Sequence, residues 1–306
     1  MLTKLASIFQ DDPFFSPLNF FRFIPYLIFK YRSLYQSPAY PLVISYPKCG
    51  RTWLRNIVFQ LDPPLNFTYT HYLASPHFWH ISPASSLAPR RIDPNTSFLL
   101  HRDPRDVVVS QFHQTLNRDL PNLLRHEKRS HTKHLLKSKQ INPPSSLSDF
   151  VVDPHWGIER VFSFNLSVLN ACVSIPVLHY ERLHIDTFTE LTSFFSSNGF
   201  NFDESSLRNA CDNCSFSRLQ AQEVLGVQDP SLRITPIANR DNSNVNNLKL
   251  RRGVVGGWVD EIPLSLHSKI NLLTAKYYSR LLAIRPDFNS IIPEDLVDLV
   301  SDILSF

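Results

Sequence analysis

The sequence predicts an α/β fold of three layers, in which helices cover both faces of a central, mostly parallel β-sheet. Short apolar runs that are typical of strands alternate with amphipathic stretches that are typical of helices, and this alternation favours parallel strands joined by helices. Four of the chain's seven glycines stand in two loops beside basic residues, where the backbone must turn sharply or approach a bound group closely. With 306 residues, of which 43% are apolar, the chain is long enough to bury one large core.

Four runs are predicted to form strands, because each is apolar or β-branched and ends near polar residues. Three of the predicted helices follow a strand, and the fourth precedes the last strand. In such a sheet, ligands bind beyond the carboxyl ends of the strands, so the residues there are the candidates for a functional site. The predicted strands cover residues 41–46, 66–71, 96–101 and 175–180, and the predicted helices cover residues 52–61, 104–116, 157–171 and 187–197.

The chain divides into three predicted segments, of which residues 40–285 carry the alternating strands and helices. Residues 1–39 are rich in aromatic side chains, but they contain neither the run of about 18 apolar residues of a membrane span nor a signal-peptide pattern. Two interpretations stay open for residues 13–35, which either pack over the core or lie on a membrane surface. Residues 286–306 form an amphipathic tail and a candidate partner-docking surface, with one helical face that carries Leu296, Leu299, Val300 and Ile303.

Composition argues against several classes of function. Four cysteines without regular spacing do not form a disulfide framework, which predicts a reducing, cytoplasmic environment, with peripheral membrane contact as the alternative. A net charge of +4 is too small to indicate nucleic-acid binding. The basic, histidine-rich stretch 125–139 is interpreted as a solvated loop, and its histidines lack a nearby carboxylate or cysteine set, so no metal site is predicted.

The first candidate site is the stretch VISYPKCGRTWLR, residues 43–55. Pro47 ends the strand, Gly50 lets the backbone turn closely around an anion, and Thr52 offers a hydroxyl at the start of the next helix. The free amides and the positive dipole end of that helix favour an anion, and Lys48 adds a mobile positive charge. In a nucleoside triphosphate loop the lysine follows the second glycine, whereas here it precedes the only glycine. The stretch therefore predicts an anion site unlike an ordinary ATPase loop.

Two further stretches predict arginine-based anion contacts. In HRDPRDVVVSQF, Arg102 stands at a strand tip and Ser110 lies along the next helix, and a guanidinium fork with a hydroxyl suits a phosphate. The alternative is a surface arginine paired with Asp103 or Asp106. In LKLRRGVVGGWVDEIP, two arginines beside three glycines suit an anion better than a hairpin turn; these are Arg251, Arg252, Gly253, Gly256 and Gly257.

Together the three stretches resemble the sulfotransferase family that uses 3′-phosphoadenosine 5′-phosphosulfate (PAPS). YPKCGRTW is similar to the family's Y-P-K-S-G-[TR]-T-W loop, RDPRDVVVS to its R-[DN]-P-[RK]-D-V-x-V-S element, and RRGVVGGW to its R-K-G-x-x-G-[DG]-[WY] element. Their order and separations also fit, over roughly residues 40–265, and the ending GWVDEIP is closer to the bacterial and algal branch. The resemblance implies a P-loop NTPase-like fold, PAPS as sulfuryl donor, 3′-phosphoadenosine 5′-phosphate (PAP) as product, a hydroxyl-bearing acceptor and no required metal.

The resemblance also implies roles for single residues. It implies that the 5′ end of the donor is lined by Lys48, Cys49, Gly50, Arg51, Thr52 and Trp53, with the indole against the adenine. It implies that the 3′-phosphate is bound by Arg102, Ser110, Arg251, Arg252 and Gly253. It implies that the adenine side is completed by Tyr180 and by a segment similar to the family's T-S-F, which consists of Cys214, Ser215 and Phe216.

Cys49 departs from the family pattern, and Cys211 and Cys214 form a motif that needs a separate interpretation. Cys49 replaces a serine that is thought to hold the lysine back until the acceptor arrives, and a thiol would do so poorly. Cys49 is either a redox sensor or a small, partly buried residue. Cys211 and Cys214 form a C-x-x-C without a second pair, and both are interpreted as helix residues.

Catalysis is expected to need Lys48 and a histidine. Lys48 is expected to donate to the oxygen that bridges sulfur and the 5′-phosphate, and a histidine suits the acceptor's proton near neutral pH. The family's histidine follows the second strand as T-H, which favours His71. His80 fits the spacing to the arginine motif in the cytosolic branch, and His77 is the third candidate.

The acceptor is expected to bind between two variable regions, residues 73–91 and 117–146. Phe78 and Trp79 in the first region indicate an apolar or ring-stacking acceptor, which favours a small alcohol, a phenol or a lipid-linked hydroxyl over a polymer. The sequence leaves the oligomeric state open. Two other functions stay as alternatives: a P-loop-like nucleotide kinase, and a non-catalytic module that binds nucleotide or a partner on the same fold.

Overall fold

The computed structural model describes residues 40–70, 92–119, 143–154, 156–225 and 244–305. In these residues four strands form one sheet in the order β2–β1–β3–β4, and every neighbouring pair is parallel. All carboxyl ends therefore meet at one edge of the sheet. The predicted parallel sheet is confirmed by the strands β1 (Leu42–Ser45), β2 (Thr68–Thr70), β3 (Ser97–His101) and β4 (Val177–His179).

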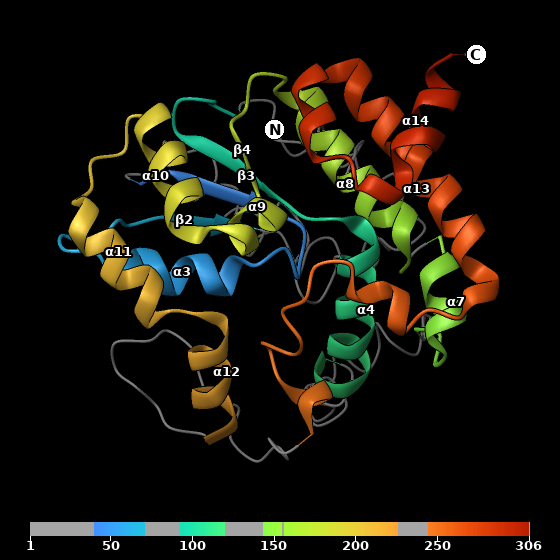
Figure 1. The fold of residues 1–306 in the computed structure, drawn as a ribbon, viewed down its shortest axis with the longest axis horizontal. Coiled ribbons are helices and arrows are strands. Elements are labelled where there is room, and N and C mark those ends of the chain that lie inside the picture. Colours follow the sequence, from blue (N-terminus) through green and yellow to red (C-terminus); the bar gives the residue numbers. More distant parts are fainter. Residues whose placement is uncertain (1–39, 71–91, 120–142, 155, 226–243, 306) are drawn as a thin grey trace, which may run out of the picture.

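Helices flank this sheet and give the chain its α/β architecture. Figure 1 shows α3 and α11 side by side below the strands, and α8, α13 and α14 packed together to their right. The four predicted helices are confirmed. The helices and their bounds are α3 (Arg51–Phe59), α4 (Pro104–Gln114), α7 (Leu147–Val152), α8 (Ile158–Ala171), α9 (Tyr180–Ile185), α10 (Thr187–Ser197), α11 (Glu204–Asn213), α12 (Phe216–Leu225), α13 (Leu264–Ile284) and α14 (Val297–Leu304).

Local sequence explains where the two helices beside the candidate site begin. α3 follows Gly50, whose φ of 93° is left-handed and favours glycine. α4 follows Asp103, whose side chain accepts a hydrogen bond from the backbone amide of Arg105, and Pro104 occupies the first turn. α4 continues beyond its last residue as a π-helical turn, Thr115–Asp119, so the predicted end at residue 116 falls inside that turn.

One hydrophobic core joins the sheet to its helices. Val43 and Ile44 of β1, with Leu99 and Leu100 of β3, are fully buried. Because helices cover both faces of a parallel sheet, its central strands bury successive residues rather than alternate ones. This explains why these strands were recognisable as continuous apolar runs.

The C-terminal tail packs on the chain's own core. α14 contacts α13, Leu296 and Val300 are buried, and Leu299 and Ile303 pack against the core. The apolar face that was a candidate partner-docking surface is therefore covered within this chain, because a helix with one apolar stripe buries it against the nearest apolar surface.

Several predicted features lie outside the described residues. These are the N-terminal segment 1–39, the basic stretch 125–139, the histidines His71, His77 and His80, and the predicted acceptor regions, of which 73–91 lies outside entirely and 117–146 for the most part. In the described part of the chain, no helix is long and apolar enough to cross a membrane.

Candidate functional site

A cavity of about 240 Å³ opens beyond the carboxyl ends of β1 and β3, and all three stretches singled out in the sequence contribute to its wall. Cys49, Cys214 and Ser215 are not among its lining residues, and His71 and His80 lie outside the described part of the chain. The predicted residues that do line the cavity are Lys48, Gly50, Arg51, Thr52, Trp53, Arg102, Ser110, Tyr180, Phe216, Arg251, Arg252 and Gly253.

The loop between β1 and α3 makes a tight left-handed turn at two positions. Gly50 has a φ of 93°, and a Cβ placed on it would lie 2.6 Å from Cδ2 of Tyr180, so only glycine fits there. Lys48 also has a positive φ of 75°, which is uncommon for a residue with a side chain. Its ammonium donates to Oε1 of Gln114 at 3.0 Å and to the backbone carbonyl of Lys249 at 3.3 Å. The loop thus presents the lysine head group inside the cavity rather than to open solvent.

Arg102 connects the first loop to the glycine-rich loop. Its guanidinium donates to the carbonyl of Lys48 at 3.1 Å and to the carbonyl of Val254 at 3.3 Å. It also lies 3.5 Å from the carboxylate of Asp106 and 4.2 Å above the ring of Tyr180. The sequence left two interpretations of Arg102 open: an anion ligand, or an arginine paired with Asp103 or Asp106. In the structure the side chain pairs with Asp106 and also lines the cavity.

Two carboxyl groups, of the buried Asp106 and the partly buried Glu181, fix the geometry around Arg102. Asp106 accepts hydrogen bonds from the backbone amides of Gly256 and Trp258, at 2.9 and 3.1 Å, and so ties α4 to the glycine-rich loop. Glu181 accepts from the backbone amide of Asp103 at 2.6 Å, and burial raises its pKa to about 7. Asp106 itself lines the cavity, whereas Glu181 does not, and both groups hold the turn that carries the arginine.

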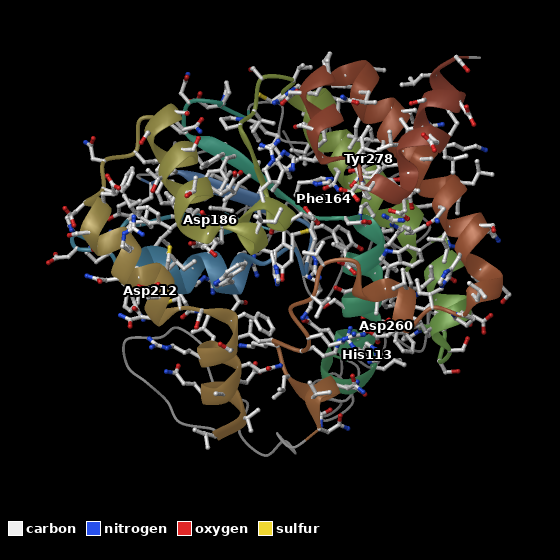
Figure 2. All side chains as sticks on the ribbon, in the orientation of Figure 1. His113, Phe164, Asp186, Asp212, Asp260 and Tyr278 are labelled. Carbon is white, nitrogen blue, oxygen red and sulfur yellow. The ribbon has the colours of Figure 1, made fainter. Side chains whose placement is uncertain are left out.

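The two arginines of the glycine-rich loop converge on one carboxylate. Arg251 makes a bidentate pair with Glu261, with N–O distances of 2.6 and 2.8 Å, and Arg252 reaches the same carboxylate at 3.1 Å and Asp260 at 2.6 Å. His113 lies 2.7 Å from Glu261, and Figure 2 shows His113 of α4 close to Asp260. Burial opposes ionisation of Glu261, but hydrogen bonds from His113 and Arg251 outweigh it and lower the pKa to about 2.

Aromatic side chains border the cavity next to this loop. The indole Nε1 of Trp53 donates to the backbone carbonyl of Cys214 at 2.8 Å, and its ring meets Tyr180 edge to face at 5.9 Å. A Cβ on Gly253 would lie 2.4 Å from the ring of Phe216, so this glycine permits the loop to pass close to the aromatic ring. The orientation of the Trp53 indole is therefore set by the backbone carbonyl of Cys214, in the segment that the sequence analysis compared with the family's T-S-F.

Cys49 is fully buried behind the loop. Burial raises the pKa of its thiol to about 12, against the opposing effect of the nearby Arg102. Thiol reactivity depends on the thiolate, which this environment suppresses. Of the two interpretations of Cys49, the environment therefore favours a small buried residue over a redox sensor. The ammonium of Lys48, which the family's serine is thought to hold, is here hydrogen-bonded to Gln114. Cys211 lies in α11 and Cys214 caps its end.

Several lining residues of the cavity were not identified from the sequence, among them Gln114, Arg55 and Glu261. Gln114 lies four residues after Ser110, and Arg55 lies four residues after Arg51, so helical spacing could have indicated both. Glu261 had no comparable indication, because its partners come together only when α4 and the glycine-rich loop pack.

The wall is strongly cationic. Its lysines and arginines outnumber its carboxylates, which are Asp106 and Glu261. Within the described ranges, no group of three or more His, Cys, Asp or Glu side chains is arranged to hold a metal ion. Guanidinium groups, a helix N-terminus and left-handed loop residues together suit a ligand with more than one anionic group, flanked by aromatic surface.

Comparison with known proteins agrees with this geometry. The family model described as "Sulfotransferase domain" matches residues 70–281. The match begins after the loop between β1 and α3, so the resemblance of that loop to the family's Y-P-K-S-G-[TR]-T-W element is independent of the family model. No curated protein sequence matches the chain.

Two solved structures are similar to this chain. A mouse sulfotransferase complexed with PAP shares 16% identity, with 79% of this chain and 83% of that chain covered and a TM-score of 0.49. A retinol dehydratase complexed with androsterone and the inactive cofactor PAP also shares 16% identity, with 82% and 83% covered and a TM-score of 0.47.

Proposed function

Because this chain belongs to the sulfotransferase domain family, we propose that it transfers the sulfuryl group of PAPS to an acceptor hydroxyl and releases PAP. One observation carries the choice of donor. The cavity has two cationic regions, one at the start of α3 and one between α4 and the glycine-rich loop, with aromatic side chains next to them. A nucleotide with a phosphosulfate at its 5′ end and a phosphate at its 3′ position matches both regions, whereas ATP has no group for the second.

The residues at the start of α3 suit the 5′ end of the donor. Gly50 and Thr52 bring backbone amides and a hydroxyl to the helix N-terminus, where an anion is favoured. Lys48 reaches into the cavity between Gln114 and the carbonyl of Lys249, and a positive charge at that position supports a role in stabilising the negative charge that develops on the leaving oxygen.

The residues from β3, α4 and the glycine-rich loop suit the 3′-phosphate. Arg102 is held by two backbone carbonyls and Asp106, and Ser110 faces the same cavity from α4. Arg251 and Arg252 line the same cavity from the glycine-rich loop, where Glu261 orients them. Trp53, Tyr180 and Phe216 offer the aromatic surface that an adenine needs.

The proposed chemistry relies on positioning and on stabilisation of developing charge. Bound PAPS supplies an activated sulfuryl group, to which the acceptor oxygen bonds as the bond from sulfur to the bridging oxygen breaks. Lys48 donates a hydrogen bond to that bridging oxygen. A histidine holds the proton that leaves the acceptor hydroxyl, and His71 is the proposed base, with His80 as the alternative.

Ligand-dependent thermal unfolding tests the donor. A ligand that binds only the folded state raises Tm in proportion to the logarithm of its concentration over Kd. We expect PAP to raise Tm more than adenosine 5′-phosphate at equal concentration, and ATP with magnesium to have the smaller effect. Stabilisation by ATP and not by PAP would refute the proposal and favour the nucleotide kinase.

A second experiment separates an enzyme from a non-catalytic binder. The protein is incubated with PAPS labelled in the sulfuryl group and with pooled alcohols and phenols, and labelled products are separated from the donor. We expect labelled acceptor in the presence of the wild type, and with Lys48→Ala its rate of formation should be about 10²–10³-fold lower. A protein that binds PAP tightly but labels no acceptor in any pool would be a nucleotide-binding module.

A further inference from the structure

Two arginines that line the cavity have no acidic partner among the described residues: Arg51 and Arg55. Every other arginine of the wall faces a carboxylate. Arg102 pairs with Asp106, and the glycine-rich loop arginines share Glu261. The two unpaired arginines therefore supply positive charge that the described part of the protein does not neutralise.

The placement of Arg51 and Arg55 costs free energy in the protein without a bound ligand. The two residues stand one turn apart on α3, where like charges repel. Burial lowers the pKa of Arg51 to about 10, and the neighbouring charge of Arg55 adds to this effect. Charged groups that lose water without gaining a partner cost free energy, so an anion that enters the cavity beside them would relieve both penalties.

The pair lies on the side of the loop opposite the proposed 3′-phosphate site. The guanidinium of Arg55 stacks 4.6 Å above the ring of Tyr69, which belongs to β2. β2 and β3 flank β1 on opposite sides, and the proposed 3′-phosphate residues Arg102 and Ser110 follow β3. The residue directly after β2 is His71, the proposed base. Arg55 therefore lies next to the strand that leads to the proton acceptor.

We propose that Arg55 forms a second anion subsite that binds an acidic group of the acceptor, whereas Arg51, one turn earlier, stays with the 5′ end of the donor. This inference rests on the proposed function, and it narrows the substrate class to hydroxyl compounds that also carry a carboxylate or a similar small anionic group. A guanidinium fork stacked on a ring is restricted in orientation, which suits a planar carboxylate better than a lysine would. The neutral alcohols and phenols are then the poorer acceptors.

The test compares three para-substituted phenols whose far ends carry a negative charge, no charge and a positive charge: para-hydroxyphenylacetate, para-cresol and tyramine. For the wild type we expect kcat/KM to fall in that order. Arg55→Gln should lower kcat/KM for para-hydroxyphenylacetate by about 10–100-fold, as expected for loss of a charge-assisted hydrogen bond. The same variant should change the value for para-cresol by less than about threefold, and Arg55→Lys should recover part of the preference for the acid.

Two controls separate this subsite from other roles of the arginine. Arg208 of α11 also stacks on a ring, 3.7 Å above Phe188, but it does not line the cavity, so Arg208→Gln should leave all three values unchanged. PAP affinity, measured by calorimetry, should be the same for Arg55→Gln and the wild type. Binding of para-hydroxyphenylacetate to the PAP-saturated protein gives a readout that needs no turnover, and Arg55→Gln should raise the Kd for it by the same factor of about 10–100.

The outcomes distinguish the subsite from the donor assignment. If Arg55→Gln weakens PAP and leaves the acceptor order unchanged, the arginine serves the donor and the inference is wrong. It is equally wrong if the wild type shows no preference for the acid, in turnover or in binding to the PAP-saturated protein. If the wild type does not bind PAP at all, the proposed function itself fails.

Discussion

Replacement of Arg102 by alanine tests the proposed 3′-phosphate site in a way that its contacts make quantitative. We expect Arg102→Ala to weaken PAP far more than adenosine 5′-phosphate, which lacks the 3′-phosphate. A hydrogen bond between a guanidinium and a phosphate contributes about 1.5–3 kcal/mol, which is about 10–150-fold in Kd. The ratio of the two Kd values, measured by calorimetry at one salt concentration, isolates this contact from general effects on the cavity.

The same substitution should also lower stability, because the arginine is only 9% exposed and pairs with a buried carboxylate. Removal of one partner of a buried pair costs about 3–5 kcal/mol. For Arg102→Ala we expect a loss of stability at the lower end of that range, because Asp106 keeps its hydrogen bonds from the amides of Gly256 and Trp258. Arg102→Lys keeps a positive charge beside Asp106 but loses the fork, so it should recover stability more than PAP affinity. Equal losses for PAP and for adenosine 5′-phosphate would refute the assignment.

Three further predictions address the base, the lysine and the counter-ion of the glycine-rich loop. Lys48→Ala should lower the rate of transfer by about 10²–10³-fold, as for loss of one preorganised donor, while PAP affinity changes little; an equal loss in both would make the lysine a binding residue only. His71→Ala should abolish most transfer to an alcohol but less to a more acidic phenol, with His80→Ala as the matched control; the opposite result would assign the base to His80. The pKa of Glu261 falls from 4.5 to about 2 on folding, so its contribution to stability is present above pH 4.5 and is lost as the pH falls through about 2. The Tm difference between the wild type and Glu261→Gln should therefore narrow over that range, and a constant difference would show that the carboxylate does not titrate with its partners.

The sequence by itself determined the fold class and most of the cavity wall. Strand and helix periods are local properties, so continuous apolar runs and amphipathic stretches indicated the four strands and the helices α3, α4, α8 and α10 within a few residues, but not helices such as α13. The turn at Gly50 and the start of α4 at Pro104 follow from the allowed backbone angles of glycine and proline. Parallel strands place their carboxyl ends at one edge, so the sequence put Arg102 and the first loop at the same edge, and the pairing of β1 with β3 makes them neighbours there.

Only the tertiary structure decided which charges are neutralised. Glu261 is ten residues from Arg251 in the chain, but His113 reaches it from another helix. The hydrogen bond from Lys48 to Gln114 likewise joins segments that the sequence treats separately. Whether an arginine meets a carboxylate depends on distances of a few ångströms, and these are set by the packing of elements far apart in sequence. The same packing left Arg55 without an acidic partner among the described residues, because it faces the ring of Tyr69 on an edge strand.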